Sequence, residues 1–393
     1  MTPSARAQAA IELLDAIIAA AREGGAAADT LIARYFATRR YAGAKDRRAV
    51  RELVYAAIRR AGEVPASGRA ALLGLAADDS ALAALFDGSP HGPAPVVHGE
   101  PVAAAGVAPH WLVEVLTASG LAAEELVALV ARAPLDLRVN PARATLAEVQ
   151  AAFAGTEPIA GLPLALRVEN GTAVDQHPLH LAGGFEVQDA GSQAVVSAID
   201  PVAGQTVIDL CAGAGGKTLA LAAAGAAPLL ACDTDRNRLS KLQPRAARAG
   251  ATQIETRLLN PGQEAGALAD WAGRADIVLI DAPCSGTGTW RRNPESRWRL
   301  TPARLDRLVQ TQAHLLGLAT GLVRPGGAIV YITCSLLDAE GAGQVAAFLA
   351  QHPGWQAEAL ALPLGRAHGP GWRLSPARDS TDGFFVARLR APC

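Results

Sequence analysis

The stretch TVIDLCAGAGGKT, residues 206–218, decides the fold of the larger part of the chain. Its apolar start, TVIDL, predicts a buried strand over 206–210, and the glycines that follow predict a tight turn into a helix. Backbone N–H groups at the start of a helix form a ready site for an anionic or polar ligand. The stretch therefore predicts a strand, a ligand-binding loop and a helix in succession.

Similar apolar runs follow to the end of the sequence, separated by segments long enough for helices. The predicted strands are PLLACD (228–233), IETRLL (254–259), DIVLIDA (276–282), AIVYITC (328–334) and FFVARL (384–389). Apolar strands that alternate with helices indicate a mainly parallel sheet covered on both faces, which is an α/β fold. Ligands of such sheets bind beyond the carboxyl ends of the strands. At or just beyond these ends lie Asp209, Asp233, Asp281, Cys284 and Cys334.

The sequence divides into three parts. Apolar residues at helical spacing predict an all-helical domain over 1–130. A small α+β module is expected over 131–185, with a strand at 135–141 and a helix at 145–155 that begins with Thr145 as its N-cap. The domain with the mainly parallel sheet then covers 186–393.

Composition excludes several classes of protein. The net charge of the 393 residues is −1, and the five cysteines have no CxxC spacing, which argues against a zinc site or a disulfide framework. No metal is expected. Neither a secretory signal nor a long uncharged apolar run is visible, so we expect a cytoplasmic protein with free thiols and no membrane span.

Three ligand classes compete for the glycine loop. A nucleotide-binding P-loop needs a glycine at position 211, which is Cys211. A dinucleotide fingerprint needs a third glycine at position 218, which is Thr218, although Asp233 stands where an acid would hold ribose hydroxyls. S-adenosylmethionine fits better, because it has ribose hydroxyls but no pyrophosphate that would require the third glycine. The fourth interpretation is a tight turn without a ligand.

Two cysteines, each followed by serine, stand beyond two predicted strands, at Cys284 and Cys334. Methylation of a pyrimidine at carbon 5 requires such a pair. A thiolate adds to carbon 6 and makes carbon 5 nucleophilic, and a base later removes the carbon 5 proton so that the thiolate can leave. Asp281, if protonated in a low-dielectric pocket, would be the acid at ring nitrogen 3. The target base must also leave its stack.

The motifs together resemble a known family. They are CAGAGGKT (211–218), ACDTD (231–235), DAPCSGTG (281–288), YITCS (331–335) and DGFFVARL (382–389). In this order they are similar to the RNA 5-methylcytosine methyltransferases of the Sun/Nop2 family over about residues 135–393, with RVNP (138–141) and FEVQDAGSQ (185–193) as lead-in elements. The N-terminal helices, with KDRRAVRELVYAAIRR (45–60), resemble the NusB-like RNA-binding domain of the bacterial members that act on 16S ribosomal RNA.

This resemblance implies a monomeric enzyme with a Rossmann-like S-adenosylmethionine-dependent methyltransferase fold, S-adenosylmethionine as cofactor and RNA, in particular ribosomal RNA, as partner. It implies that Cys334 adds to carbon 6, that Cys284 assists release of the product, and that Asp281, with Lys217 beside it, lies near the methyl donor and the target base. The implied cofactor-binding residues are Cys211, Ala212, Gly213, Ala214, Gly215, Gly216, Lys217, Asp233, Asn260 and Asp281.

Two departures from the family pattern motivate an alternative function. Gly213 and Ala214 replace the usual Ala-Pro, which makes the loop less rigid, and Asn260 replaces an aspartate that lies near the adenine. The alternative is a catalytically degenerate RNA-binding or ribosome-assembly factor.

Basic segments suggest where RNA would lie. Residues 1–60 contain 11 Lys and Arg against 6 Asp and Glu, and KDRRAVR (45–51) is a candidate for phosphate contact. WRRNPESRWR (290–299) interleaves arginine with tryptophan, a composition typical of surfaces that bind unpaired RNA. The other interpretations are a solvated helix face for the first segment and a structural loop for the second.

Overall fold

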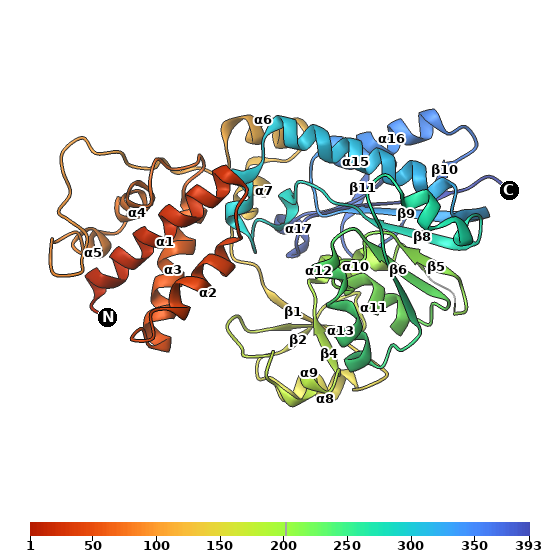
Figure 1. Cartoon of the computed structure of the whole chain (residues 1–393), viewed down its shortest axis with the longest axis horizontal. Coiled ribbons are helices and arrows are strands. Elements are labelled where there is room, and N and C mark those ends of the chain that lie inside the picture. The colour runs from red at the N-terminus through yellow and green to blue at the C-terminus, as the bar shows by residue number, and fades with distance from the viewer. Residues whose placement is uncertain (201–202) are drawn as a thin grey trace. The chain divides into compact units, whose positions relative to one another are not determined.

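The structure is a computed structural model that describes residues 1–200 and 203–393. The chain forms two compact units (Figure 1). The first unit comprises Met1–Arg132 together with Thr289–Thr301, and the second comprises Ala133–Gly288 with Pro302–Cys393. The first unit thus includes a segment that the sequence-based division placed in the domain with the mainly parallel sheet.

The first unit is helical, as the sequence predicts. Its helices are α1 (Pro3–Glu23), α2 (Ala28–Ala37), α3 (Ala44–Arg60), α4 (Gly68–Ala76), α5 (Ser80–Ala83), α6 (His110–Ala118) and α7 (Ala123–Ala128). The side chain of Thr2 accepts a hydrogen bond from Ala5 N and caps α1, which ends at the left-handed Gly24. Helix α4 packs closely on α1, because a Cβ added to Gly68 would lie 2.2 Å from Ile11 O. The apolar faces of α1, α2, α3 and α4 form the core of this unit.

The Arg–Trp segment that was predicted to bind RNA is instead buried in the first unit. The 3₁₀ helix η3 (Pro294–Arg299) packs against α1 and α3. The side chains of Arg297 and Trp298 are 0% and 5% exposed. Arg297 donates to Ala61 O at 2.8 Å and also to Ile58 O, and Trp298 Nε1 donates to Ala61 O at 3.3 Å.

The physical reason is that helix α3 ends there. The last carbonyls of a helix have no partner within the helix, and the planar guanidinium offers several donors in one plane. Arg297 therefore caps the carboxyl end of α3, while Glu295 accepts from Ala28 N at the start of α2 at 3.0 Å. The prediction of an RNA surface is wrong for Arg297 and Trp298, and the alternative of a structural loop is right.

Replacement of Trp298 by alanine is expected to lower the free energy of unfolding by about 3–5 kcal/mol, because a buried indole leaves a cavity. Urea unfolding followed by circular dichroism measures this change. The control is Arg307→Ala on the exposed face of helix α15 (Pro302–Thr320), which should change stability by less than about 0.5 kcal/mol. A surface role would instead give Trp298→Ala unchanged stability and weaker RNA binding.

The second unit begins with a small module. Strands β2 (Glu157–Pro158), β3 (Ala165–Val168), β1 (Leu135–Val139) and β4 (Phe185–Val187) form an antiparallel sheet in that order. Helices α8 (Leu146–Ala152) and α9 (Pro178–Leu181) lie between the strands along the chain. Thr145 is the N-cap of α8, as predicted, and forms a capping box with Glu148.

The large sheet has the order β11-β12-β13-β9-β8-β5-β6-β7. Strands β5 (Val207–Asp209), β6 (Leu229–Asp233), β7 (Ile254–Leu258), β8 (Ala275–Asp281) and β9 (Val323–Thr333) are parallel. Strand β13 (Phe384–Arg390) pairs with β9, β12 (Gly371–Leu374) pairs with β13, and β11 (Arg366–His368) pairs with β12, each antiparallel to its neighbour. The short strand β10 (Gln356–Ala357) also pairs with β13. The predicted α/β fold with a mainly parallel sheet is confirmed.

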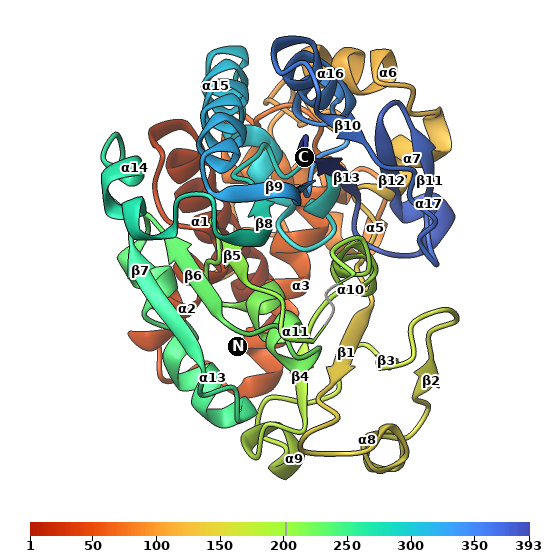
Figure 2. The same cartoon turned by 90° about the vertical axis from the view of Figure 1, so that its right-hand side faces the viewer.

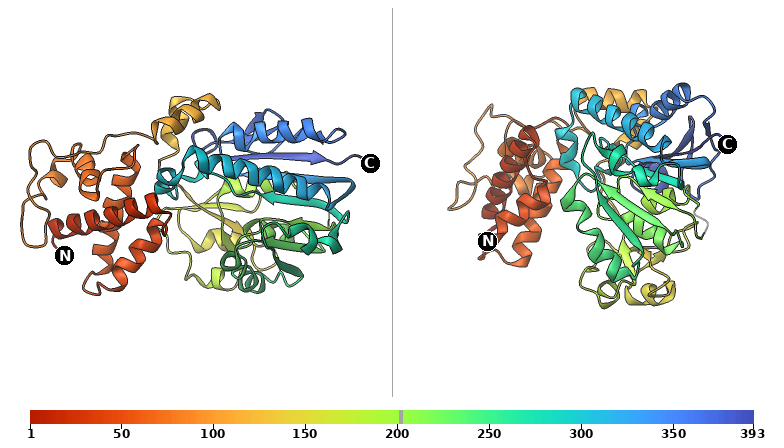
Figure 3. Two further views of the ribbon diagram at one scale, coloured as in Figure 1. Left: turned by 45° about the horizontal axis from the view of Figure 1, so that its top comes forward. Right: turned by 45° about the vertical axis from the view of Figure 1, so that its right-hand side comes forward.

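Helices cover both faces of this sheet because alternate strand residues point to opposite sides. Val207, Leu229 and Leu279 pack with α10 (Ala190–Val196), α11 (Gly216–Ala223) and α13 (Leu242–Ala249). Ile208, Leu230 and Val278 pack on the other side with α15 and α16 (Ala342–Gln351). Figures 2 and 3 show α15 and α16 lying along the strands, away from α11 and α13.

The remaining short elements connect these layers. They are α12 (Arg236–Leu239), α14 (Glu264–Ala267), η1 (Ala269–Trp271), η2 (Thr287–Thr289), η4 (Asp338–Glu340) and α17 (Pro376–Asp379). Strand β5 lies between β6 and β8. The chain runs outward from β5 to β6 and β7 and then crosses to β8 on the other side of β5, so the strand order switches at the carboxyl end of β5. Within the described residues, no helix is both long and apolar enough to cross a membrane.

Candidate functional site

The glycine loop runs from β5 directly into α11 at the switch point of the sheet. Gly213 and Gly215 have φ values of 56° and 86°, in the left-handed region that favours glycine. Gly213 N donates to the Asp233 carboxylate at 2.7 Å, and Ala214 O accepts from Arg245 at 2.6 Å. These two bonds hold the loop in place without the proline that the family pattern has there.

Asp233 ends β6, and the loop fixes its carboxylate. The second oxygen of the carboxylate accepts from Asp235 N at 2.7 Å, so two backbone N–H groups orient this buried side chain. Each carboxylate oxygen keeps a further lone pair for a ligand hydroxyl. The structure therefore brings Asp233 and Gly213 together, as a site for a ribose requires.

Asn260 lies in the chain just beyond β7. Leu259 N donates to Asp233 O at 2.9 Å, which places the following residue, Asn260, near the carboxyl end of β6. The Asn260 side chain is exposed, so a ligand that reached this edge would meet it without displacing other groups.

Cys211 and Ala212 form the wall where the loop leaves β5. Burial raises the pKa of the Cys211 thiol well above its usual range, which makes it inert as a nucleophile. Ala212 N donates to Cys232 O at 2.8 Å and ties the loop to β6. These two residues shape the loop and offer no reactive group.

Lys217 and Asp281 form an ion pair between α11 and β8. Lys217 Nζ lies 2.7 Å from Asp281 Oδ2, and the lysine side chain is 7% exposed. The ammonium also lies 5.4 Å from the centre of the Phe384 ring. The structure therefore places Lys217 directly beside Asp281, the neighbour that the family resemblance implied.

Asp209 supports the loop from below. Burial raises the pKa of Asp209 to about 7, and the hydrogen bond from Thr218, with Oγ1 2.7 Å from Oδ2, opposes this shift. Its other oxygen accepts from Cys211 N at 3.3 Å. Asp209 thus ties the end of β5 to the first turn of α11 and does not face a ligand.

The two cysteines lie side by side. Cys284 follows β8, Cys334 follows β9, and these strands are parallel neighbours in which Asp281 pairs with Ile332. The two sulfur atoms are 3.4 Å apart, and both residues are partly exposed. Gly288 N donates to Cys334 O at 3.0 Å, which closes the loop after β8 over the end of β9.

The environment distinguishes the two thiols. The hydrogen bond to Cys334, burial and the charge of Glu340 raise the pKa of Cys284 well above its usual range. Cys284 therefore keeps its proton at neutral pH and can donate it toward the Cys334 sulfur.

Sequence reasoning missed a polar cluster beneath the cysteines. Its members are Ser285, Thr287, Gln312, Ser335 and Glu340, which hydrogen-bond to one another. The serine that follows each cysteine is the signal in the sequence that points to this cluster. Nothing in the sequence distinguishes Glu340 from an exposed glutamate.

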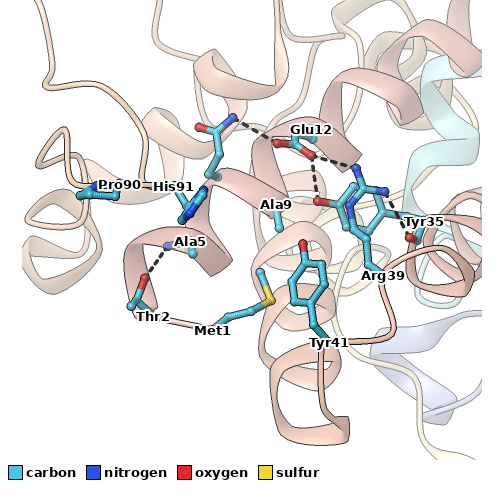
Figure 4. A pocket seen from close by; sticks show the side chains of 11 residues that line it. Met1, Thr2, Ala5, Ala9, Glu12, Tyr35, Arg39, Tyr41, Pro90 and His91 are labelled. Atoms are coloured by element: carbon cyan, nitrogen blue, oxygen red, sulfur yellow. Dashed lines mark hydrogen bonds and ion pairs between the residues drawn. The ribbon is translucent and has the colours of Figure 1, made fainter.

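A separate cavity of about 610 Å³ lies in the first unit, far in sequence from the cysteines (Figure 4). Tyr35 donates to Glu12 at 2.8 Å, and the Arg39 guanidinium stacks 3.6 Å from the centre of the Tyr35 ring. Glu12, Tyr35 and Arg39 therefore bind one another along one wall of the cavity.

Known proteins resemble this chain in sequence. A family model described as 16S rRNA methyltransferase RsmB/F matches residues 196–390. The probable ribosomal RNA small subunit methyltransferase B of Synechocystis is 36% identical over 300 residues, which are 72% of this chain and 66% of that protein. The ribosomal RNA small subunit methyltransferase B of Sodalis glossinidius is 36% identical over 66% of this chain and 59% of that protein. The chain therefore spans somewhat under two thirds of the length of these curated relatives.

Solved structures share the fold. The crystal structure of PH0851 matches with a TM-score of 0.77 and 23% identity over 99% of each chain. NSun6 from Pyrococcus horikoshii, crystallised with SFG, matches with a TM-score of 0.61 and 18% identity over 68% of this chain and 93% of its own. Residues 196–390 of this chain therefore match the 16S rRNA methyltransferase RsmB/F family, and the sequence relatives carry the name ribosomal RNA small subunit methyltransferase B.

Proposed function

We propose that the protein transfers a methyl group from S-adenosylmethionine to carbon 5 of a cytosine in RNA, specifically 16S rRNA. The observation that carries this proposal is the pair of thiols 3.4 Å apart at the ends of adjacent strands, in a chain that matches the RsmB/F family. A single thiol would serve for attack alone. Two adjacent thiols with different environments fit a reaction that needs both a nucleophile and a base.

The residues at the switch point fit S-adenosylmethionine, which supplies the methyl group when it is bound. Asp233, oriented by Gly213 N and Asp235 N, would accept from the ribose hydroxyls. The loop from Cys211 to Lys217 would line the rest of the cofactor, with Asn260 toward the adenine and Asp281 toward the methyl group. No pyrophosphate group needs to be accommodated, which fits Thr218 in place of a third glycine.

In the proposed reaction, the Cys334 thiolate adds to carbon 6 of cytosine, and the ring electrons move so that carbon 5 becomes nucleophilic. Carbon 5 then takes the methyl group. Cys284 first releases its own proton to solvent, and its thiolate then accepts the carbon 5 proton. The electrons of the carbon 5–hydrogen bond form the ring double bond again, the carbon–sulfur bond at carbon 6 breaks, and the Cys334 thiolate is restored. A thiol with a raised pKa is a strong proton acceptor when ionised, so the environment of Cys284 suits this role.

The Lys217–Asp281 pair would face the polar edge of the target ring. Its carboxylate accepts a hydrogen bond from the exocyclic amine of cytosine, and its ammonium balances the negative charge that develops on the ring during attack. This pair replaces the neutral Asp281 that the sequence suggested as the acid.

RNA contact outside the reaction centre is proposed for the first unit. In the segment 45–51, Arg47, Arg48 and Arg51 are exposed on α3, although Arg51 also pairs with Asp29 at 2.7 Å. Exposed arginines on one helix provide the sequence-independent phosphate attraction that RNA binding needs. The cytoplasmic location and the monomeric state stay predictions from the sequence.

Replacement of Asp233 by alanine is expected to weaken S-adenosylmethionine binding about 10- to 100-fold, because hydrogen bonds to a charged acceptor contribute roughly 1.5–3 kcal/mol. Isothermal titration calorimetry measures the dissociation constant. The matched control is Asp306→Ala on the exposed face of α15, which should bind as the wild type does. An unchanged dissociation constant for Asp233→Ala would show that Asp233 does not bind the ribose.

The test of the function is methyl transfer from labelled S-adenosylmethionine to 16S rRNA, followed by digestion to nucleosides. The proposal requires the label in 5-methylcytidine. Cofactor binding without transfer would overturn the activity. Absence of both would favour the alternative, a catalytically degenerate RNA-binding or assembly factor, for which Gly213, Ala214 and Asn260 are the motivation. A P-loop nucleotidase would instead hydrolyse ATP, although Lys217 is already paired with Asp281.

A further inference from the structure

We infer that Glu340 is a positioning residue for the two-cysteine site: its carboxylate anchors a chain of hydroxyl groups that holds Cys284 against Cys334. The inference rests on the proposed function for its catalytic consequence. Its structural basis is the hydrogen bonding beneath the cysteines.

Glu340 is a buried carboxylate with an unusual set of partners. It is 0% exposed and lies at the end of η4. One oxygen accepts from Ser285 N at 2.8 Å and from Gln312 Nε2 at 3.0 Å, and the other accepts from the Ser285 hydroxyl. Among the described residues, no lysine, arginine or histidine forms an ion pair with it. Burying an uncompensated charge is costly, so this carboxylate is held there by its neutral donors.

The two Cys-Ser pairs are joined through their serines. Ser285 Oγ lies 3.1 Å from Ser335 Oγ, and Thr287 Oγ1 lies 3.2 Å from Ser335 Oγ. The Ser335 hydroxyl also accepts from Leu337 N at 3.1 Å. Because each serine follows its cysteine directly, this contact fixes the backbone at both thiols.

The donors in this cluster form one directed chain. The Ser285 hydroxyl donates to the Glu340 carboxylate, which leaves the Ser285 oxygen free to act as an acceptor. The Ser335 hydroxyl is then the donor toward Ser285, and the Thr287 hydroxyl is the donor toward Ser335. Thr287 in turn accepts from Leu336 N at 2.8 Å. Each of the three hydroxyl groups thus donates to the next group in the chain, and the Glu340 carboxylate is the last acceptor.

Glu340 is itself held by two other elements. Tyr331 on β9 donates to Glu340 O at 2.8 Å. Gln312 on α15 donates to Pro283 O at 2.9 Å as well as to the carboxylate. The loop that carries Cys284 is therefore tied through Glu340 and Gln312 to a strand and to a long helix. Such support allows little drift of the reactive groups.

A glutamine at position 340 would break this arrangement while keeping its size. If the amide nitrogen faced Ser285 N and Gln312 Nε2, it would meet donors only. If it faced the Ser285 hydroxyl, it would donate to it and reverse the direction of the hydroxyl chain. The titratable groups that face Cys284 are Cys334 and Tyr331 on or after β9 and Glu340 in η4. The substitution thus changes both the position of the cysteines and the charge beside Cys284.

The test compares Glu340→Gln with the wild type in the full chain. We expect kcat for methyl transfer to fall about 10- to 100-fold, because small displacements of reacting groups cost rates of this size, with KM for rRNA and the S-adenosylmethionine dissociation constant unchanged. Site-resolved alkylation by iodoacetamide is expected to show the Cys284 profile shifted to lower pH. The matched control is Glu264→Gln, which alters another buried carboxylate of the same unit and should change neither measurement.

Ser285→Ala serves if Glu340→Gln does not fold, since it removes one hydroxyl and keeps the bond from the backbone N–H. It should lower kcat in the same way. Unchanged kcat in the folded variants would overturn the positioning role, and so would a fall in kcat with an unchanged Cys284 alkylation profile in Glu340→Gln. Failure of the proposed function itself would appear differently, as absent methyl transfer in the wild type with the alkylation shift intact.

Discussion

The Cys334→Ala variant is expected to lose methyl transfer to rRNA by at least about 10⁴-fold, since removal of a catalytic nucleophile has effects of this order. Carbon 5 of cytosine is a poor nucleophile until a thiolate adds at carbon 6, and alanine offers no group that adds. The measurement is incorporation of label from S-adenosylmethionine into 16S rRNA. Binding of the cofactor should be retained, because Cys334 lies beyond β9 and the ribose site lies beyond β6.

Cys393→Ala is the matched control for Cys334→Ala. Cys393 is an exposed free thiol near the carboxyl end of the same unit, so its removal tests the chemistry of losing a thiol without touching the site. This control should methylate at the wild-type rate. Near-normal activity in Cys334→Ala would show that Cys334 is not the nucleophile. Loss of activity in both variants would point to general damage to the protein.

Local patterns in the sequence predicted the parts of the site that the sheet itself positions. Apolar runs gave the parallel strands, and parallel strands bring their carboxyl ends to one edge of the sheet. For that reason the sequence alone predicts that one crevice contains Asp233, Asp281, Cys284 and Cys334. The glycine loop was equally predictable, because Gly213 and Gly215 adopt backbone angles that other residues avoid.

The other parts depend on contacts between segments that are remote in sequence. Arg297 and Trp298 have the composition of an RNA surface, but a guanidinium satisfies helix carbonyls as well as it satisfies phosphates. Only the position of the end of α3 decides between the two. The 2.7 Å contact between Lys217 Nζ and Asp281 likewise joins a helix and a strand that are remote in sequence. Glu340 reaches Ser285 only because η4 folds back beneath both cysteines.

The Cys284→Ala variant is expected to accumulate a covalent protein–RNA adduct. Attack by Cys334 and methyl transfer do not need Cys284, but the carbon 5 proton then has no acceptor and the carbon–sulfur bond persists. Turnover should fall about 10²- to 10⁴-fold, the range for loss of a general base, while about one methyl group per enzyme molecule is still transferred. End-labelled RNA that migrates slowly with the protein on a denaturing gel measures the adduct.

The double variant Cys284→Ala/Cys334→Ala is the control, and it should give no slow band because the attacking thiol is absent. The 3.4 Å between the two sulfur atoms is the same seen from either residue, so distance alone does not assign the roles. The contact with Cys334, which both thiols share, is the largest cause of the raised pKa of Cys284, and burial and the Glu340 charge add to it. If the roles were exchanged, the band would appear in Cys334→Ala and be absent in Cys284→Ala. The gel therefore tests which of the two thiols attacks the ring and which one releases the product.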